Sequence, residues 1–479
     1  MNTKQRVLLV VIVLLAVFFR FYQIVRMPGG LFPDEAANGL DVNLMQQGHL
    51  QPFYERGNGR EALFFYMEWA STALLGKGQW QFHIVSSLVG VLSVLAVFFV
   101  TRRLFLLDAA GEENEPAQRR AGNLALLAAF LMAVSSWHVV LSRTALRANL
   151  TPLFGALTLY ALLCVYQARS LKARLWLSLL AGATFALGFY TYIAFRIMGP
   201  ILFMILAWPL LAALKQRRLA ETLRRYWLPF VLFLAAFIAV VFPLADYFYH
   251  NFDYFIGRSG QVSVFNQSLY LVDGQQLAGK PPLPVVLSVV WTVLKTAVAG
   301  FFTHGDLNWR QNISGYPLLS PLLSPFFGAA LIVISLLGIW YFFAPAKRAR
   351  YWKYFLLTGW FWGMLLPEVA TAEGIPHGLR SAGAIAPTFI IAAWGLYEAW
   401  QLLLRLHKRL WSYALEHFRD PQWMRDSRLV PPRMRLVDWS FKLLAACFFL
   451  ALPLQTYFLY FVYAANSAEY FYAFRADLT

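Results

Sequence analysis

Charged residues are scarce in this sequence: Asp, Glu, Lys and Arg make up 14% of its 479 residues, whereas hydrophobic residues make up 59%. Soluble domains carry about 25% charged residues, so this composition excludes a soluble fold and indicates a membrane protein. Cysteine is also rare. Cys164 and Cys447 both fall in apolar stretches, which excludes a disulfide framework and a cysteine-based metal site.

Acidic residues are fewer than basic ones, 24 against 41, and the formal net charge is +17. A strongly basic chain can bind nucleic acid. Here, however, the basic residues fall in short clusters between apolar stretches, which is the pattern of cytoplasmic loops. We therefore predict no nucleic-acid partner.

Apolar stretches of roughly 17 to 25 residues, long enough to cross a bilayer, recur along the chain. The sequence predicts a single all-α polytopic membrane domain over residues 1–479 with about eleven transmembrane helices. The predicted spans are 6–25, 81–101, 122–141, 150–167, 174–192, 197–214, 227–245, 322–343, 352–369, 383–401 and 440–463. With the N-terminus in the cytoplasm, the basic clusters, including the loop 402–438, fall inside. We expect a multi-pass protein of the plasma (inner) membrane.

Two outer segments are long enough to form a site. The first outer loop, 26–80, is expected to contain two interfacial helices, 35–47 and 61–75. The segment 246–321, between spans seven and eight, is expected to be a lid because it is rich in Gly and Pro. Its apolar part, 282–302, is predicted to lie at the outer interface, because a single crossing there would invert every later loop.

Two adjacent carboxylates, Asp34 and Glu35, closely follow the first predicted span. Ionisable groups at a membrane boundary are candidates for function, and a carboxylate can act as a general base on a hydroxyl. The alternative is that Asp34 caps a short helix, because Asp is a preferred N-cap residue and Pro33 would fix the approach. The two interpretations are compatible.

Arginine recurs in the outer segments, although short outer loops usually contain little of it. An anionic phosphate would explain the set, since guanidinium groups match phosphate oxygens. Pairing with acidic residues or with lipid phosphates is the alternative for any single arginine. His377 lies in one of the same turns, where a histidine more often stabilises the turn than acts in catalysis. The candidate phosphate-binding residues are Arg56, Arg60, Arg143, Arg147, Arg196, Arg380 and His377.

The segments that carry these residues resemble a family of membrane enzymes. Residues 32–39 (FPDEAANG) and 52–76 (PFYERGNGREALFFYMEWASTALLG) are similar to the first outer loop of the C-type glycosyltransferase superfamily. Within it they resemble the dolichyl-phosphate-mannose protein mannosyltransferases and the bacterial lipid A aminoarabinose transferases. Residues 136–153, 188–200 and 375–387 look like segments of bacterial relatives of that group.

The resemblance implies a polyprenyl-phosphate-linked monosaccharide donor and an inverting transfer, of a hexosyl or pentosyl group, to an acceptor hydroxyl on the outer face. Asp34 matches the position of the family's catalytic carboxylate, with Glu35 beside it. The acceptor would be a lipid, a glycan or a protein, and membrane lipids would surround the chain. We predict no cofactor, because the outer arginines are favoured over the divalent metal that related oligosaccharyl transferases use.

Other functions are compatible with the sequence. A transporter or flippase of a lipid-linked or phosphorylated substrate would carry charged residues near the bilayer midplane, and the centres of the predicted spans are almost free of them. A non-catalytic assembly or sensor protein would use Asp34 and Glu35 only as a helix cap. A polymerase of lipid-linked glycans is an alternative within the enzyme class.

Overall fold

The computed structural model of the chain describes residues 1–57, 59–109, 115–266, 271–272, 275–276, 281–345, 351–371, 374–417 and 432–474. Parts of two predicted segments lie outside these residues. They are 418–431 of the basic loop, and 267–270, 273–274 and 277–280 of the lid.

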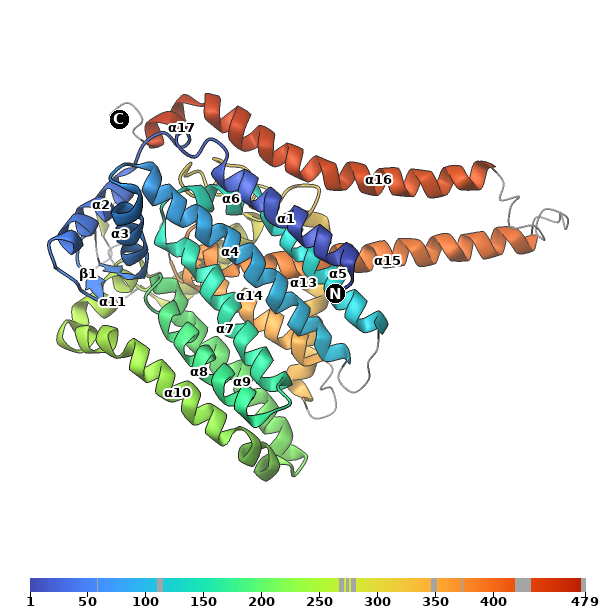
Figure 1. The fold of residues 1–479 in the computed structure, drawn as a ribbon, viewed down its shortest axis with the longest axis horizontal. Helices are drawn as coiled ribbons and strands as arrows, with labels where there is room; N and C mark the ends of the chain where they lie inside the picture. The colour runs from blue at the N-terminus through green and yellow to red at the C-terminus, as the bar shows by residue number, and fades with distance from the viewer. Residues whose placement is uncertain are drawn as a thin grey trace.

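Helices make up most of the described chain (Figure 1). They are α1 (Thr3–Phe21), α2 (Pro33–Gln46), α3 (Leu63–Leu75), α4 (Trp80–Phe105), α5 (Glu115–Ala133), α6 (Ser136–Arg143), α7 (Leu150–Gln167), α8 (Leu171–Gly188), α9 (Met198–Lys215), α10 (Leu219–His250), α11 (Phe252–Val262), α12 (Leu283–Ala299), α13 (Ser324–Phe343), α14 (Trp352–Val369), α15 (Ile385–His417), α16 (Pro432–Tyr457) and α17 (Ala468–Ala473). Two short antiparallel hairpins pair β1 (Phe53–Tyr54) with β2 (Arg60–Glu61) and β3 (Leu271–Val272) with β4 (Gln275–Gln276).

The all-α membrane architecture is confirmed, but the count of eleven spans is not. Among the described residues, seven helices are long and apolar enough to cross a bilayer, or eight if α5 and α6 form one bent span. The helices α1, α8 and α14 occupy the predicted spans 6–25, 174–192 and 352–369 but are not among the seven. Each of them carries charged residues near one or both ends, which shortens its apolar part.

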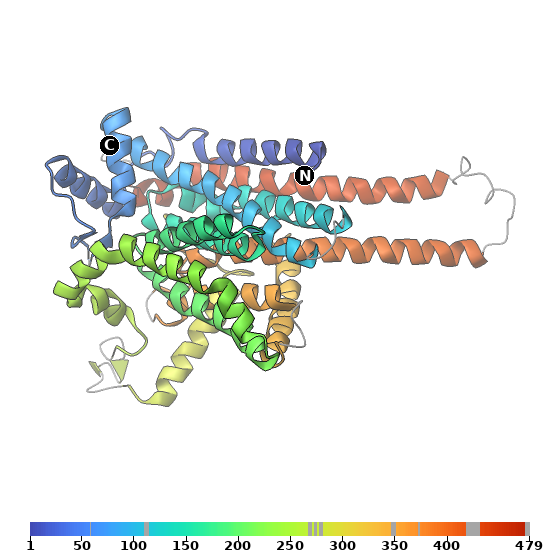
Figure 2. The ribbon, with the colours of Figure 1, turned by 60° about the horizontal axis from the view of Figure 1, so that its bottom comes forward.

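Burial separates the helices into a centre and a periphery. In α4, α7 and α15, 72–78% of the apolar stretch is buried, whereas in α9, α10, α13 and α16 only 17–33% is buried. The central helices therefore bury their side chains against protein, and the peripheral ones leave most of their apolar side chains exposed. The two helices α15 and α16 also extend beyond the rest of the bundle (Figures 1 and 2). Their extensions include residues 402–417 and 432–438 of the segment predicted to be a loop, 402–438.

The predicted span 122–141 is broken into α5 and α6, which meet at an angle of 60°. Both helix ends at the break are capped by side chains. The guanidinium of Arg20 donates to the carbonyl oxygens of Met132 (3.3 Å) and Ala133 (3.0 Å), which end α5. The hydroxyl of Ser135 accepts from the backbone N–H of His138 (3.4 Å) at the start of α6. These bonds satisfy backbone groups that a helix end leaves unpaired.

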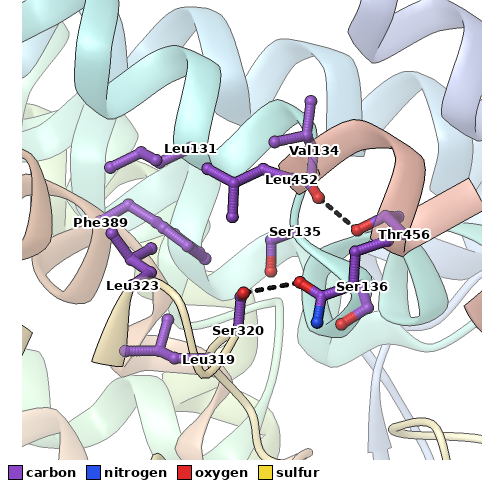
Figure 3. Close-up of a pocket in the computed structure, with 11 residues that line it drawn as sticks. Leu131, Val134, Ser135, Ser136, Leu319, Ser320, Leu323, Phe389, Leu452 and Thr456 are labelled. Atoms are coloured by element: carbon purple, nitrogen blue, oxygen red, sulfur yellow. Dashed lines mark hydrogen bonds between the residues drawn. The ribbon is translucent and has the colours of Figure 1, made fainter. Parts of the chain in front are cut away.

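A small cavity lies beside this break (Figure 3). Thr456 of α16 donates to the carbonyl of Val134 (2.5 Å), and Ser320 donates to the side chain of Gln455 (2.6 Å). The cavity volume is about 20 Å³, which is room for about one water molecule. It is therefore part of the packing between α5, α6 and α16 and not a substrate site.

The two ends of the bundle differ. Figure 1 places α2, α3 and the β1–β2 hairpin at the same end as α17, and the chain N-terminus lies away from that end. We call it the first-loop end and the other the opposite end. The short apolar helix α12, predicted to be interfacial, contacts α14 at the edge of the bundle (Figure 2).

Close packing of α8 on α10 depends on a glycine. A Cβ atom at Gly182 would lie 2.1 Å from the carbonyl oxygen of Phe233, and real Cβ atoms do not approach so closely. We expect Gly182→Val to push α10 away from α8 and to destabilise the protein by roughly 1–3 kcal/mol or more.

Thermal unfolding of the purified protein in one detergent measures this effect. Gly199→Val is the matched control, because a Cβ there would meet none of the described residues within 4 Å. Equal unfolding temperatures for the two variants would contradict the predicted contact.

Candidate active site

The helix α2 begins at Pro33 and presents Asp34 and Glu35 in opposite environments. Proline suits the first helical position because its fixed φ and missing N–H cost nothing there. The Glu35 carboxylate turns back and accepts a hydrogen bond from the backbone N–H of Phe32 (3.0 Å), which fixes the helix start. Asp34 is exposed, whereas Glu35 is fully buried. The predicted pair is therefore not symmetrical.

The Glu35 side chain links the first loop to the bundle by contacts with α4 and with the turn after α6. Its second oxygen accepts from the backbone N–H of Ala145 (2.6 Å), in the turn after α6, and lies 3.3 Å from Nε2 of His83 in α4. A buried carboxylate that accepts several such bonds is held in one position. These contacts favour a positioning role for Glu35 and leave Asp34 as the accessible carboxylate.

The first-loop arginines Arg56 and Arg60 converge on one buried carboxylate, Asp41. Arg56 Nε lies 3.0 Å from Asp41, and Arg60 pairs with the other oxygen of the same carboxylate. Arg60 also donates to the side chain of Asn38 (2.7 Å) and to the carbonyl of Asp34 (3.4 Å). Arg60 is buried, so its contacts brace α2 against the hairpin, while the side chain of Arg56 keeps 43% exposure.

Arg147 and Arg196 come together on Glu61 of strand β2. Nε of Arg147 lies 3.2 Å from one carboxylate oxygen, and a terminal nitrogen of Arg196 lies 3.6 Å from the other. Arg147 precedes α7 and Arg196 precedes α9, so a single buried carboxylate joins the first loop to two further turns. The guanidinium of Arg147 lies over the ring of Tyr192, and its central carbon is 5.5 Å from the centre of that ring.

Arg380 and His377 lie in the segment between α14 and α15, next to these residues. Burial, together with the positive charges of Arg380, Arg258 and Arg310, lowers the pKa of His377 to about 3. His377 is therefore neutral at physiological pH. Burial raises the pKa of Tyr192, and the positive charges of Arg147, Arg380 and Arg258 oppose this rise. These three guanidinium groups therefore act on the same side chain.

The loop 306–312 supports this region. The carboxylate of Asp306 accepts from the backbone N–H groups of Gly378 (2.8 Å) and Asn308 (2.8 Å). The guanidinium of Arg310, in the same loop, lies 4.6 Å from the centre of the ring of Phe32. Phe32 precedes Asp34 by two residues. The loop therefore connects the segment of His377 and Arg380 to the start of α2.

Arg143, the remaining predicted arginine, does not join this group. It is fully buried and donates to the carbonyl oxygens of Phe19 (3.2 Å), Arg20 (2.9 Å) and Met27 (2.9 Å). Its guanidinium also lies 5.0 Å from the ring of Tyr460. These contacts join α6 to the end of α1, and we leave Arg143 out of the site proposed below.

The helix α11, in the predicted lid, contacts the first-loop end of the bundle. Tyr247 and Tyr254 each donate to the carboxylate of Glu55, both at 2.9 Å. Arg196 donates to the carbonyl of Phe255 (2.5 Å) and lies over its ring. This segment is therefore in contact with both the first loop and the Arg196 turn.

Sequence analysis missed Arg258 and Arg310. Both lie in the long segment 246–321, where arginine is less unexpected than in the first loop and the short turns. They are the two arginines of that segment, so extending the list of outer arginines beyond the short turns would have included them. The other signal, their closeness to His377, exists only in the folded protein.

No group of three or more His, Cys, Asp or Glu side chains that could hold a metal occurs in the described part of the chain. The carboxylates Asp41 and Glu61 are each paired with arginine instead. The absence of a cofactor stays a prediction.

The contacts of Glu35 and Asp34 predict opposite effects on stability. Glu35→Ala should lower the free energy of unfolding by roughly 1–3 kcal/mol, because the N–H groups of Phe32 and Ala145 would lose their acceptor. Asp34→Asn should leave the unfolding temperature unchanged, because Asp34 is exposed. Thermal unfolding of the two variants in one detergent tests this, and an equal loss in both would contradict the assignment.

Comparison with known proteins gives no match to a family model and none to a curated protein. Solved structures do match. The aminoarabinose transferase ArnT from Cupriavidus metallidurans, bound to undecaprenyl phosphate, aligns with a TM-score of 0.54 and 15% identity over 99% of this chain and 77% of that chain. Its apo state aligns at 0.50, with 13% identity over 98% and 74%.

The archaeal oligosaccharyltransferase AglB from Archaeoglobus fulgidus, in complex with an inhibitory peptide and a dolichol-phosphate, aligns with a TM-score of 0.51 and 16% identity. The match covers 95% of this chain and 55% of the archaeal one, so the chain spans about half the length of that enzyme. These neighbours are members of the C-type glycosyltransferase superfamily. The chain therefore has the fold of that superfamily, as the resemblance of its first loop implies.

Proposed function

We propose that the protein is a membrane glycosyltransferase that moves a monosaccharide, a hexosyl or pentosyl group, from a polyprenyl-phosphate donor to an acceptor hydroxyl. The observation that carries this proposal is the exposed carboxylate of Asp34 at the first-loop end, where arginines from separate segments contact the Asp34 backbone, Glu61 and Phe32. A base for the acceptor and cations for a leaving phosphate are the two requirements of this reaction. The reaction would take place at the first-loop end, on the outer face of the membrane.

The donor phosphate would lie among Arg147, Arg258 and Arg380, with Arg196 held behind them by Glu61 and Phe255. Like charges brought close together repel, so an anion in this region would stabilise their arrangement. Neutral His377 can donate or accept a hydrogen bond there without adding charge. Arg310, over Phe32, lies between this region and Asp34.

The reaction would proceed in one displacement. The acceptor oxygen attacks the anomeric carbon, and its proton passes to the Asp34 carboxylate. The bond between that carbon and the phosphate oxygen breaks, so polyprenyl phosphate leaves with the electron pair and the configuration at the carbon inverts. Fixed guanidinium groups stabilise the charge that develops on the phosphate, without a divalent metal.

Two of the fold neighbours support this donor class. The solved structures of ArnT and AglB contain undecaprenyl phosphate and dolichol-phosphate, respectively. A lipid, a glycan or a protein remains open as the acceptor. The transporter alternative is separated from this proposal by the experiment below.

We expect Asp34→Asn to reduce transfer by about 10²-fold or more, because the base would be lost while the fold is kept. Membranes containing the wild type or the variant would be supplied with a panel of radiolabelled polyprenyl-phosphate sugars, and the loss of label from the lipid would be followed. Asp253→Asn, an exposed aspartate of α11, is the control and should keep wild-type activity.

Transfer by Asp34→Asn at the wild-type rate would refute its role as the base. If the wild type consumes no donor but moves it across the bilayer, the protein is a transporter and the arginines bind a transported phosphate.

Arg258→Gln should weaken the binding of polyprenyl phosphate by at least about tenfold, since a charge-assisted hydrogen bond contributes about 1.5–3 kcal/mol. Equilibrium binding to the purified protein measures this without turnover. Arg224→Gln, which removes an equal charge at the opposite end, should bind as the wild type does. An unchanged affinity in Arg258→Gln would remove Arg258 from the donor site.

A further inference from the structure

A large groove opens at the opposite end of the bundle, and none of the residues of the candidate site lines it. It has a volume of about 1640 Å³, larger than the roughly 300–1,000 Å³ of pockets for drug-sized ligands. Its walls come from most of α9, from the last turns of α7 and α13, and from the first turns of α8, α10 and α14. We call it the α7–α10 groove.

The walls of the groove are apolar and aromatic. Tyr166, Trp227 and Phe230 line it, and each keeps more than half of its surface exposed. Deeper in the groove, Leu202 and Phe233 are buried residues that form its inner wall. Only 17% of the apolar stretch of α10 is buried. The groove therefore offers a long apolar surface that suits hydrocarbon chains.

The mouth of the groove is basic. Among the described residues that line it, Arg169, Arg218, Arg225 and Lys353 are basic and Glu221 is acidic. The three arginines are exposed. Within the described chain, none of them forms an ion pair with a carboxylate. The charges of these three arginines are therefore available to an anion.

We propose that the α7–α10 groove binds an anionic membrane phospholipid from the leaflet at the opposite end. Its acyl chains would cover the aromatic wall, and its headgroup phosphate would lie among Arg169, Arg218 and Arg225. Basic pockets between transmembrane helices bind anionic headgroups in this way, and guanidinium groups match phosphate oxygens. The bound lipid completes the packing of α10. This site is separate from the donor site and does not depend on the proposed reaction.

The test uses the full-length protein, purified and stripped of lipid, and measures lipid binding by native mass spectrometry. Phosphatidylglycerol should bind at least about tenfold more tightly than phosphatidylcholine. The double variant Arg218→Gln/Arg225→Gln should lose this preference. Lys215→Gln/Arg224→Gln removes the same charge from the same segment but does not line the groove, and it should keep the preference.

Unfolding temperatures without lipid establish that both double variants are folded. The proposal is overturned if the wild type does not prefer phosphatidylglycerol, or if the two double variants lose the preference equally. It is also overturned if undecaprenyl phosphate displaces phosphatidylglycerol one for one, since the groove would then hold the chain of the donor.

Discussion

The buried carboxylates of the first loop determine how the first-loop end is arranged. Glu35, Asp41 and Glu61 are each at most 2% exposed, and a buried carboxylate is costly unless it is hydrogen-bonded or paired. Glu35 and Glu61 are satisfied by groups from other segments of the chain, and Asp41 is paired with two arginines of the loop itself, so the loop has little freedom to shift. Asp34 differs because it stays exposed on a helix start that its neighbour fixes.

The same constraint explains the arginines. Glu61 offsets part of the charge of Arg147 and Arg196, and the surrounding protein supplies further partners to Arg380 and Arg258. Drawing guanidinium groups from several turns into one region requires negative charge nearby. A phosphate bound there would strengthen an arrangement that the fold already holds, so little reorganisation would accompany the reaction. The tyrosines that donate to Glu55 hold the end of α10 and the start of α11 against the first loop.

Hydrophobic length and charge pattern were sufficient to predict the helical membrane fold, and the fold implied by the resemblance of the first loop is the one shared with the solved neighbours. The difference between Asp34 and Glu35 could not be predicted, because it depends on the N–H of Ala145, which is distant in sequence. Arg143 belongs with the other arginines by its position in a turn, yet its contacts are with the end of α1. The break between α5 and α6 depends on Arg20, another distant residue.

The two ends of the protein thus present two basic sites with different chemistry. The first-loop end combines arginines with an accessible carboxylate, as a transfer reaction requires. The opposite end combines arginines with an apolar groove, as a structural lipid requires. Phosphate binding alone therefore does not identify the active site, and the position of the bound phosphate relative to Asp34 does.

The most direct test of the account is a cryo-EM structure of the full-length protein with polyprenyl phosphate bound. We predict that the phosphate lies within hydrogen-bond distance of at least two of Arg147, Arg258 and Arg380, with Asp34 facing the space that the sugar would occupy. A phosphate bound among Arg169, Arg218 and Arg225 at the opposite end, with the first-loop end empty, would contradict it.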